Sequence, residues 1–542
     1  MRVFWPSSGI QRNQGVVVGW RIKDTLCVVD IADSRNDDLA GSLKSIIPTT
    51  CDYRLISLGQ AQPAESTQTH SSATIMFWLS KDEIPILCSE SVQLILYTPP
   101  DSTRLRFLRT STPFRGFRNQ AMAVQDEYGI GQKSSVKTEE INEIISLINI
   151  SKVAQRDLSC MATSGYRRNP INNDELKWST MTSAFLAILF LPLRMCAQAL
   201  YLTLNHHTSV GSFRQFSSTI DQFALRLSQG IQGPKRFMST RQVGLGIEVR
   251  SESYIRFWNT VWLIFNDVIL GYTARQLILL YAPFIQQLLE SSIPKHLVEL
   301  PINALKWLND WPVGLKLNTP LSQFFCTGLG SIMQKWGADV VLPHLDTLLP
   351  SMIRLFALSS LGGLTLTLSL LNDTITILTS HFHLCHLLMR YIFNWQLESL
   401  SGLWNLFRGK RWNVLRQRTD SYEYDVDQLF LGTLLFTVSA FLFPTVLTYF
   451  GLFALFRAAT VGSQKILTGA VTALNAFPLF ELMLRIKEPS RLPAGVHIKL
   501  KSVSGKGTGV DSNGRSAITH VLELKNSPKS IPEILFPPSS QS

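Results

Sequence analysis

The chain has 542 residues, of which 45% are hydrophobic and 17% are charged, and its formal net charge is +12. Soluble domains usually carry about a quarter charged residues, so this composition excludes an ordinary soluble protein along the whole length and favours a helical membrane part joined to a soluble one. Much of the positive charge lies in loops beside apolar runs and not on one soluble face, which argues against nucleic acid as a partner.

Residues 1–178 contain short apolar runs, such as VVVGWRI and TLCVVDI, between turns rich in Pro, Ser and Asp. These runs are too short to cross a bilayer and predict strands, and the spacing of isoleucines over residues 139–155 predicts an amphipathic helix. The first residues form no continuous apolar stretch before a cleavage site, so we expect no cleaved signal peptide. We therefore predict a cytosolic α+β domain over residues 1–178, with docking as its simplest role.

Six apolar segments follow, at residues 179–204, 255–289, 321–349, 351–380, 428–456 and 463–484. Each is near or beyond the roughly 20 residues that span hydrocarbon, so together they predict a polytopic α-helical membrane domain over residues 179–490. Arg194, Asp267, Arg275 and Asp373 interrupt these segments. Charges at membrane depth are tolerated mainly against other helices, water or another subunit, which indicates assembly, although snorkelling explains Arg194 and Arg275 equally well.

The stretch 301–325 differs from the apolar segments because tryptophans and lysines alternate with apolar residues around a Pro and a Gly. This pattern predicts an interfacial or re-entrant segment at residues 301–318. A membrane-surface anchor or a contact for a partner helix is the expected role, and a lipid-substrate contact is the sharper alternative. The candidate residues of this interfacial motif are Trp307, Pro312, Gly314 and Lys316.

Residues 404–427 form a basic loop directly before a long uncharged run. By the positive-inside rule the loop is cytosolic, and the basic stretch after residue 484 predicts that the last two spans return the chain to the cytosol. Residues 491–542 end in a Pro/Ser-rich sequence and are expected to form a flexible cytosolic tail. The loop residues expected to contact anionic headgroups or a partner are Trp404, Arg408, Lys410, Arg411, Trp412, Arg416 and Arg418.

Few residue patterns suggest chemistry. Asp425 and Asp427 form a D-x-D, which holds a metal in many nucleotide-sugar transferases, but capping of the helix that follows explains both carboxylates better. The seven scattered cysteines contain no CxxC pair, and the His/Cys cluster at 381–386 divides between two helix faces, so we predict no metal site. We expect no catalytic residue and no cofactor.

Two stretches resemble a known family. SLSGLWNLFRGKRWNVLRQRTDSYEYDVDQLFLGTLLFT at 399–437 closely resembles the hallmark segment of the Q subunit of the phosphatidylinositol N-acetylglucosaminyltransferase complex, and WLNDWPVGLKLN at 307–318 resembles the family's second signature. The chain looks like a fungal-like member of this family. In the second signature, Asn309, Asp310 and Trp311 depart from the family's smaller residues.

The resemblance implies a multi-pass subunit in the endoplasmic-reticulum membrane. Its complex transfers GlcNAc from UDP-GlcNAc to phosphatidylinositol on the cytosolic face, the first step of glycosylphosphatidylinositol (GPI) anchor synthesis. The resemblance further implies that this subunit stabilises the complex without being its catalyst. The implied partners are a catalytic glycosyltransferase subunit, other small membrane subunits and a phosphatidylinositol-containing membrane.

Two other function classes stay open. A polytopic lipid transporter or scramblase is suggested by the charges within apolar segments, although no internal repeat accompanies them. A stand-alone membrane glycosyltransferase would need a soluble nucleotide-binding domain, of which the sequence carries no motif.

Overall fold

The structure is a computed structural model that describes residues 1–10, 12–32, 55–63, 75–80, 83–101, 104–109, 133–163, 191–205, 207–208, 211–241, 247–310, 314, 317–413, 416–503, 516–518 and 520–536. It divides into two compact units. The sheet unit comprises Met1–Met195, Gly230–Trp262 and Pro478–Ser542, and the helical unit comprises Cys196–Gln229 and Leu263–Phe477.

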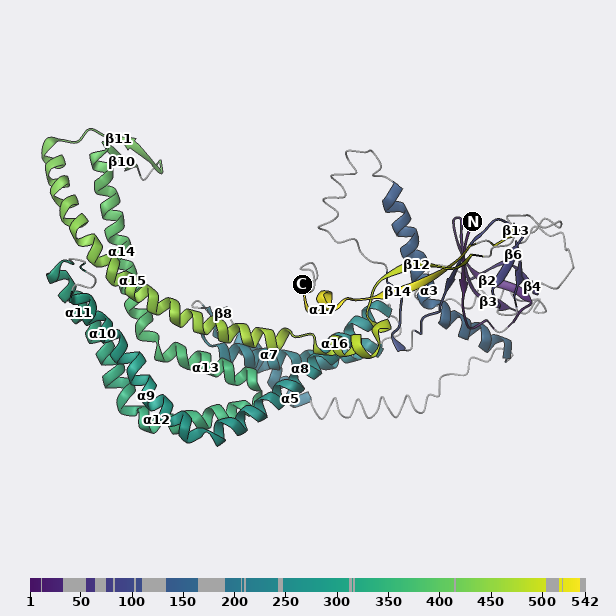
Figure 1. The fold of residues 1–542 in the computed structure, drawn as a ribbon, viewed down its shortest axis with the longest axis horizontal. Helices are drawn as coiled ribbons and strands as arrows, with labels where there is room; N and C mark the ends of the chain where they lie inside the picture. The colour runs from purple at the N-terminus through teal and green to yellow at the C-terminus, as the bar shows by residue number, and fades with distance from the viewer. Residues whose placement is uncertain are drawn as a thin grey trace. The chain divides into compact units, whose positions relative to one another are not determined.

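The sheet unit is built on a mixed sheet of ten strands among the described residues, in the order β12-β14-β7-β1-β3-β2-β4-β5-β6-β13 (Figure 1). The N-terminal strands are β1 (Arg2–Pro6), β2 (Gly15–Ile22), β3 (Thr25–Ala32), β4 (Ile56–Pro63), β5 (Ile75–Leu79), β6 (Pro85–Cys88) and β7 (Gln93–Tyr97). Alternating side chains along them enter two separate apolar clusters, as the pleat requires for a sheet buried on both faces. The predicted strand-rich region is therefore present.

Helix α3 (Lys133–Thr163) covers one face of this sheet. Ile144, Ile145 and Ile148 pack against Phe4 and Trp20 in one buried cluster, as the amphipathic spacing predicts.

The C-terminal residues differ from the flexible tail that we expected. Strands β12 (Pro493–Val503) and β14 (His520–Pro528) pair antiparallel, and β14 continues the sheet by pairing parallel to β7, with Val521 opposite Leu94. Strand β13 (Ser516–Ala517) and helix α17 (Ile531–Leu535) complete the segment. The strand forms because Leu522 and Leu524 recur at the two-residue period and join the cluster under α3.

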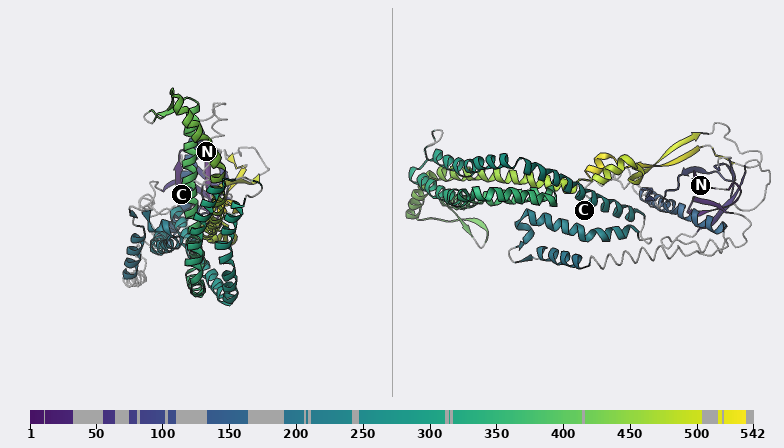
Figure 2. Two further views of the ribbon diagram at one scale, coloured as in Figure 1. Left: turned by 90° about the vertical axis from the view of Figure 1, so that its left-hand side faces the viewer. Right: turned by 90° about the horizontal axis from the view of Figure 1, so that it is seen from below.

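The helical unit contains long helices that lie along one another (Figure 2). The first are α5 (Leu191–Asn205), α6 (Phe213–Phe216), α7 (Ser218–Arg241), α8 (Ile247–Leu280), α9 (Ala282–Pro294), α10 (Leu300–Asn309) and α11 (Thr319–Gln334), with the two-residue strands β8 (His207–Thr208) and β9 (Gly211–Ser212). They are followed by α12 (Leu342–Ser359), α13 (Leu364–Leu378), α14 (Ser380–Phe407) and α15 (Val426–Ala476). The π-helical turns η2 (Lys295–Glu299) and η4 (Lys335–Val341) and the 3-10 turn η5 (Ser360–Gly362) join consecutive helices. The boundaries between the two units fall within α5, α7 and α8, and after α15.

Three stretches of the described chain are long and apolar enough to cross a membrane: Ile247–Leu280, Thr319–Gly362 and Val426–Ala476. They overlap five of the six predicted segments. The first stretch overlaps 255–289, the second contains 321–349 and the start of 351–380, and the third contains 428–456 and most of 463–484. Residues 179–190 of the first predicted segment lie outside the described residues.

Helix α15 differs from the two separate spans that we predicted at 428–456 and 463–484. It runs for 51 residues, about 76 Å at the helical rise, with no turn between residues 457 and 462. The sequence there offers Gly462 as its weakest helix former, and one glycine costs about 1 kcal/mol, which packing overrides. The break falls instead at Phe477 and Pro478, after which the short helix α16 (Leu479–Lys487) starts in the sheet unit.

Candidate functional site

The predicted basic loop is a β-hairpin that joins α14 to α15 (Figure 1). Strands β10 (Lys410–Asn413) and β11 (Arg418–Ser421) pair antiparallel. Gly409, at a φ of +62°, lets the chain leave α14 into the hairpin, and its carbonyl accepts a hydrogen bond of 2.8 Å from the N–H of Tyr422. The hairpin is thus held to the end of α14 by its own main chain.

The five cations of the hairpin differ in their surroundings. The Arg418 Nε donates to Asp420 Oδ1 at 2.8 Å, and the Arg411 guanidinium lies 5.3 Å from the ring centre of Tyr422. Arg408, Lys410 and Arg416 form no ion pair with any other residue that the structure describes. Trp404 and Trp412 are 54% and 55% exposed, so the surface combines available cations with exposed indoles, as at membrane interfaces.

The two aspartates after the hairpin lie at the start of α15. Asp425 is the N-cap residue but its side chain makes no capping hydrogen bond, and Asp427 lies in the first turn. The helix therefore begins two residues before the apolar segment that we predicted at 428–456. Both carboxylates are exposed near the positive end of the helix, where a negative charge contributes up to about 1 kcal/mol. Among the described residues no group of three or more His, Cys, Asp and Glu side chains has the arrangement of a metal site.

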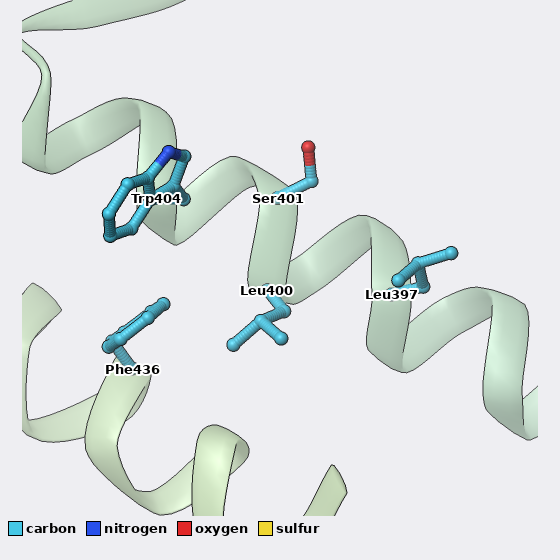
Figure 3. A pocket seen from close by; sticks show the side chains of 5 residues that line it. All are labelled: Leu397, Leu400, Ser401, Trp404 and Phe436. Atoms are coloured by element: carbon cyan, nitrogen blue, oxygen red, sulfur yellow. The ribbon is translucent and has the colours of Figure 1, made fainter. Parts of the chain in front are cut away.

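A shallow apolar pocket of about 280 Å³ lies between α14 and α15 close to the hairpin. Figure 3 shows Trp404 and Leu400 of α14 and Phe436 of α15 converging on it, with Leu397 and Ser401 further along its rim. Phe436 packs against two rings of α14, with its ring centre 6.0 Å from that of Trp404 and 5.2 Å from that of Phe407. No sequence pattern predicted this pocket, because its walls come from two separate helices whose packing is not visible in the sequence.

The second signature joins α10 to α11. Trp307 is 57% exposed on α10, and Gly314 has a φ of +76°, which favours glycine. Pro312 and Lys316 lie outside the described residues. After the loop, Asn318 caps α11 by accepting from the N–H of Leu321 at 3.1 Å.

This signature is tied to α15 by buried polar contacts. The N–H of Asn318 donates to Thr445 Oγ1 at 3.0 Å. The hydroxyls of Ser322 and Tyr449 are 2.9 Å apart, and Ser322 donates to Asn309 Oδ1 at 3.1 Å. Asn309, a departure from the family pattern in the sequence, therefore has a structural partner next to the loop.

A cluster of polar side chains, separate from the contacts between the second signature and α15, joins four helices of the helical unit. Arg226 of α7 forms an ion pair with Asp267 of α8 at 2.7 Å, and their side chains are 18% and 6% exposed. Thr365 of α13 donates to Asp267 through both its N–H (2.9 Å) and its hydroxyl (2.7 Å). The same Arg226 nitrogen donates to Asn475 Oδ1 of α15 at 3.1 Å, and Gln222 completes the cluster through hydrogen bonds to Thr365 and Asn475.

The other predicted intramembrane carboxylate, Asp373 of α13, lies at the N-terminus of α7. It accepts hydrogen bonds from the hydroxyl of Ser217 (2.6 Å) and from the N–H groups of Ser218 (2.8 Å) and Thr219 (2.9 Å). These are donors that a helix start leaves unpaired. Arg275 is half-buried on α8, and the side chain of Arg194 lies outside the described residues.

The sequence reasoning missed Arg226, because α7 is not apolar and fell outside the predicted segments. The available signal was Gln222 and Arg226, which are four residues apart and share one helix face.

The architecture defines a mostly helical protein with a strand-rich unit, three candidate membrane-crossing stretches and polar clusters between its helices. Residues 220–494 match the family described as "N-acetylglucosaminyl transferase component (Gpi1)". The chain belongs to this family, and the resemblance seen in the sequence is thereby confirmed.

Individual relatives agree. The chain is 28% identical to the Schizosaccharomyces pombe "N-acetylglucosaminyl-phosphatidylinositol biosynthetic protein gpi1", over 92% of this chain and 83% of the relative. It is 38% identical to the Homo sapiens "Phosphatidylinositol N-acetylglucosaminyltransferase subunit Q" over 38% of this chain and 28% of the relative. For the Saccharomyces cerevisiae "Phosphatidylinositol N-acetylglucosaminyltransferase subunit GPI1" the identity is 31%, over 51% of this chain and 44% of the relative. No solved structure matches the chain significantly.

Proposed function

We propose that the chain is a noncatalytic, complex-stabilising subunit of an endoplasmic-reticulum complex that transfers GlcNAc from UDP-GlcNAc to phosphatidylinositol, the first step of GPI-anchor biosynthesis. The observation that carries the proposal is the match of residues 220–494 to the family, together with relatives named as subunits of a phosphatidylinositol N-acetylglucosaminyltransferase. The proposed partners are the catalytic glycosyltransferase subunit and the small membrane subunits of that complex.

The contacts of the polar residues support a scaffold. Asp267 and Asp373, which suggested a transporter or scramblase, each accept hydrogen bonds from several groups of neighbouring helices. Such saturated contacts fix the helices relative to one another, whereas a proton or ion relay requires carboxylates that change partners. The contacts therefore favour the scaffold over the transporter.

The sheet supports a common location for both chain ends. Because β14 is hydrogen-bonded to β7, the N-terminal strands and the C-terminal strands belong on one side of a membrane. On the positive-inside rule, we assign both the sheet and the basic hairpin to the cytosolic side.

The proposal is tested by capturing the full chain through a tag in mild detergent and measuring GlcNAc transfer from labelled UDP-GlcNAc to phosphatidylinositol. We expect activity in the captured complex and none from the chain purified alone. Activity from the chain alone would show that it is a catalyst. Absence of activity in both preparations would favour the transporter.

A further inference from the structure

The hairpin and the apolar pocket lie next to each other on α14. Arg408 ends this helix, four residues or about 6 Å beyond Trp404 of the pocket wall, and Lys410 begins β10. Strand β10 contacts α14, so both cations stay close to the helix end. An apolar pocket and a pair of cations thus follow one another along one helix.

The two cations are available for a ligand. Of their neighbours, Arg418 is neutralised by Asp420 and Arg411 stacks on Tyr422, while Arg408 and Lys410 form no ion pair within the described part of the chain. The hairpin from residue 408 to residue 422 contains five cations and one carboxylate, so its field attracts an anion.

With the hairpin at a membrane surface, as proposed above, the pocket lies next to the start of the acyl chains. Phe436 is inside the uncharged run 428–456 of a candidate membrane-crossing helix, and four of the five lining side chains are apolar. An acidic soluble peptide could reach the cations but not a pocket that opens into hydrocarbon. A molecule with an anionic head and an apolar tail matches both parts in their order along α14.

We propose that this site binds one anionic glycerophospholipid, with its phosphate at Arg408 and Lys410 and part of an acyl chain in the pocket of Leu400, Trp404 and Phe436. The inference rests on the proposed function only in placing the hairpin at a membrane surface. It adds a lipid ligand to a chain whose proposed role is assembly. The head group is selected by charge, because one Lys or Arg near an anionic surface gives a roughly fivefold preference.

The test uses the full chain in detergent and two photoactivatable lipids with the same diazirine acyl chain, phosphatidylinositol and phosphatidylcholine. After illumination, labelled peptides are quantified by mass spectrometry. We expect phosphatidylinositol to label residues 397–407 and 430–440 about tenfold more than phosphatidylcholine does. Two cations with a fivefold preference each would give about 25-fold, and salt screening lowers this to about tenfold.

Two variants separate the parts of the site. Arg408→Gln with Lys410→Gln should lower phosphatidylinositol labelling about tenfold and leave phosphatidylcholine labelling unchanged, whereas Leu400→Trp should lower both by filling the pocket. The matched control, Lys487→Gln with Lys499→Gln, removes two exposed cations elsewhere and should change neither. Equal elution volumes in size-exclusion chromatography establish that the variants are folded.

Two results would overturn the inference. Equal labelling by both lipids, insensitive to the loss of both cations, would mean nonspecific contact with bulk lipid. Cross-linking of the hairpin to a protein subunit in the captured complex, without lipid label, would make it a protein contact. GlcNAc transfer is measured on the same captured material to keep the two proposals distinct. Loss of lipid labelling with persisting transfer would overturn only the lipid site, whereas loss of transfer with persisting labelling would overturn only the proposed function.

Discussion

The ion pair between Arg226 and Asp267 permits a quantitative test of the helical unit. Replacing Arg226 by Met retains an unbranched side chain but leaves the Asp267 carboxylate, 6% exposed, without its cation. Breaking a buried pair in this way costs about 3–5 kcal/mol. The lower end applies here, because Thr365 still donates two hydrogen bonds to the carboxylate. We therefore expect a loss of about 3 kcal/mol.

The assay is thermal unfolding of the full chain in detergent. For a unit of a few hundred residues, 1 kcal/mol corresponds to roughly 2–4 °C, so Arg226→Met should lower the midpoint by roughly 6–12 °C. The double variant Arg226→Met with Asp267→Asn removes both charges and keeps an acceptor for Thr365, so it should be more stable than the single one.

Arg275→Met is the matched control, because Arg275 is half-buried on α8 and forms no ion pair with the residues that the structure describes. It should shift the midpoint by no more than 1–2 °C on the scale of an ordinary surface substitution. An equally small shift for Arg226→Met, or a double variant less stable than the single one, would refute the coupling that we infer from the geometry.

Four further predictions address other parts of the chain. Gly363→Ala should destabilise the helical unit, because the new Cβ would overlap the Asp267 carboxylate and the residue has a φ of +122°, which favours glycine. Gly462→Ala, with open space around it, should stabilise α15 by about 0.5–1 kcal/mol in the same thermal assay. Burial raises the pKa of Asp30 to about 6, so the folded chain retains a proton that the unfolded chain releases, and stability should fall as the pH rises from about 4 to 6. Asp30→Asn, which keeps the acceptor for the Ile31 N–H, should abolish that slope and add up to about 3 kcal/mol at neutral pH; an unchanged slope in unfolding scans would contradict the assignment. Asp425→Asn with Asp427→Asn should preserve GlcNAc transfer by the captured complex, since Asp425 makes no capping hydrogen bond that could be lost and each charge near the helix start contributes at most about 1 kcal/mol; loss of transfer would indicate a metal site. A cysteine at Ser421 should react with an impermeant maleimide outside sealed microsomes, and protection would place the hairpin in the lumen.

Local patterns predicted the elements that depend on neighbouring residues. The short apolar runs of residues 1–100 became strands, and the isoleucine spacing of 139–155 became the buried face of α3, because strand and helix periodicities are legible within a few residues. The hallmark segment around the basic loop likewise predicted the family, because its residues are consecutive in the sequence.

The parts that were not predicted depend on partners distant in the sequence. The strand at 520–528 is stabilised by pairing with β7, which lies more than 400 residues earlier, and no local sequence pattern predicts that pairing. The pairing of Arg226 with Asp267 and the meeting of Trp404 with Phe436 likewise arise from packing between helices. The sequence predicted Asp267 as a buried charge in need of a partner, but not the partner.

The sheet also constrains how the chain passes through the membrane. With β7 and β14 in one sheet, the chain must cross an even number of times between residues 97 and 520, and yet three described stretches are long enough to cross. Either a further passage exists, for which the predicted apolar segment 179–204 is the candidate, or one of the three stretches enters and leaves on the same side. Helix α15 does not suit the second case, because its 51 residues form one helix with no turn, and the loss of one main-chain hydrogen bond at Pro444 does not reverse a helix. The cysteine at Ser421 therefore distinguishes the two routes: protection requires that α15 crosses once, and labelling from the cytosolic side requires that the chain turns back within α15, where the structure has an unbroken helix.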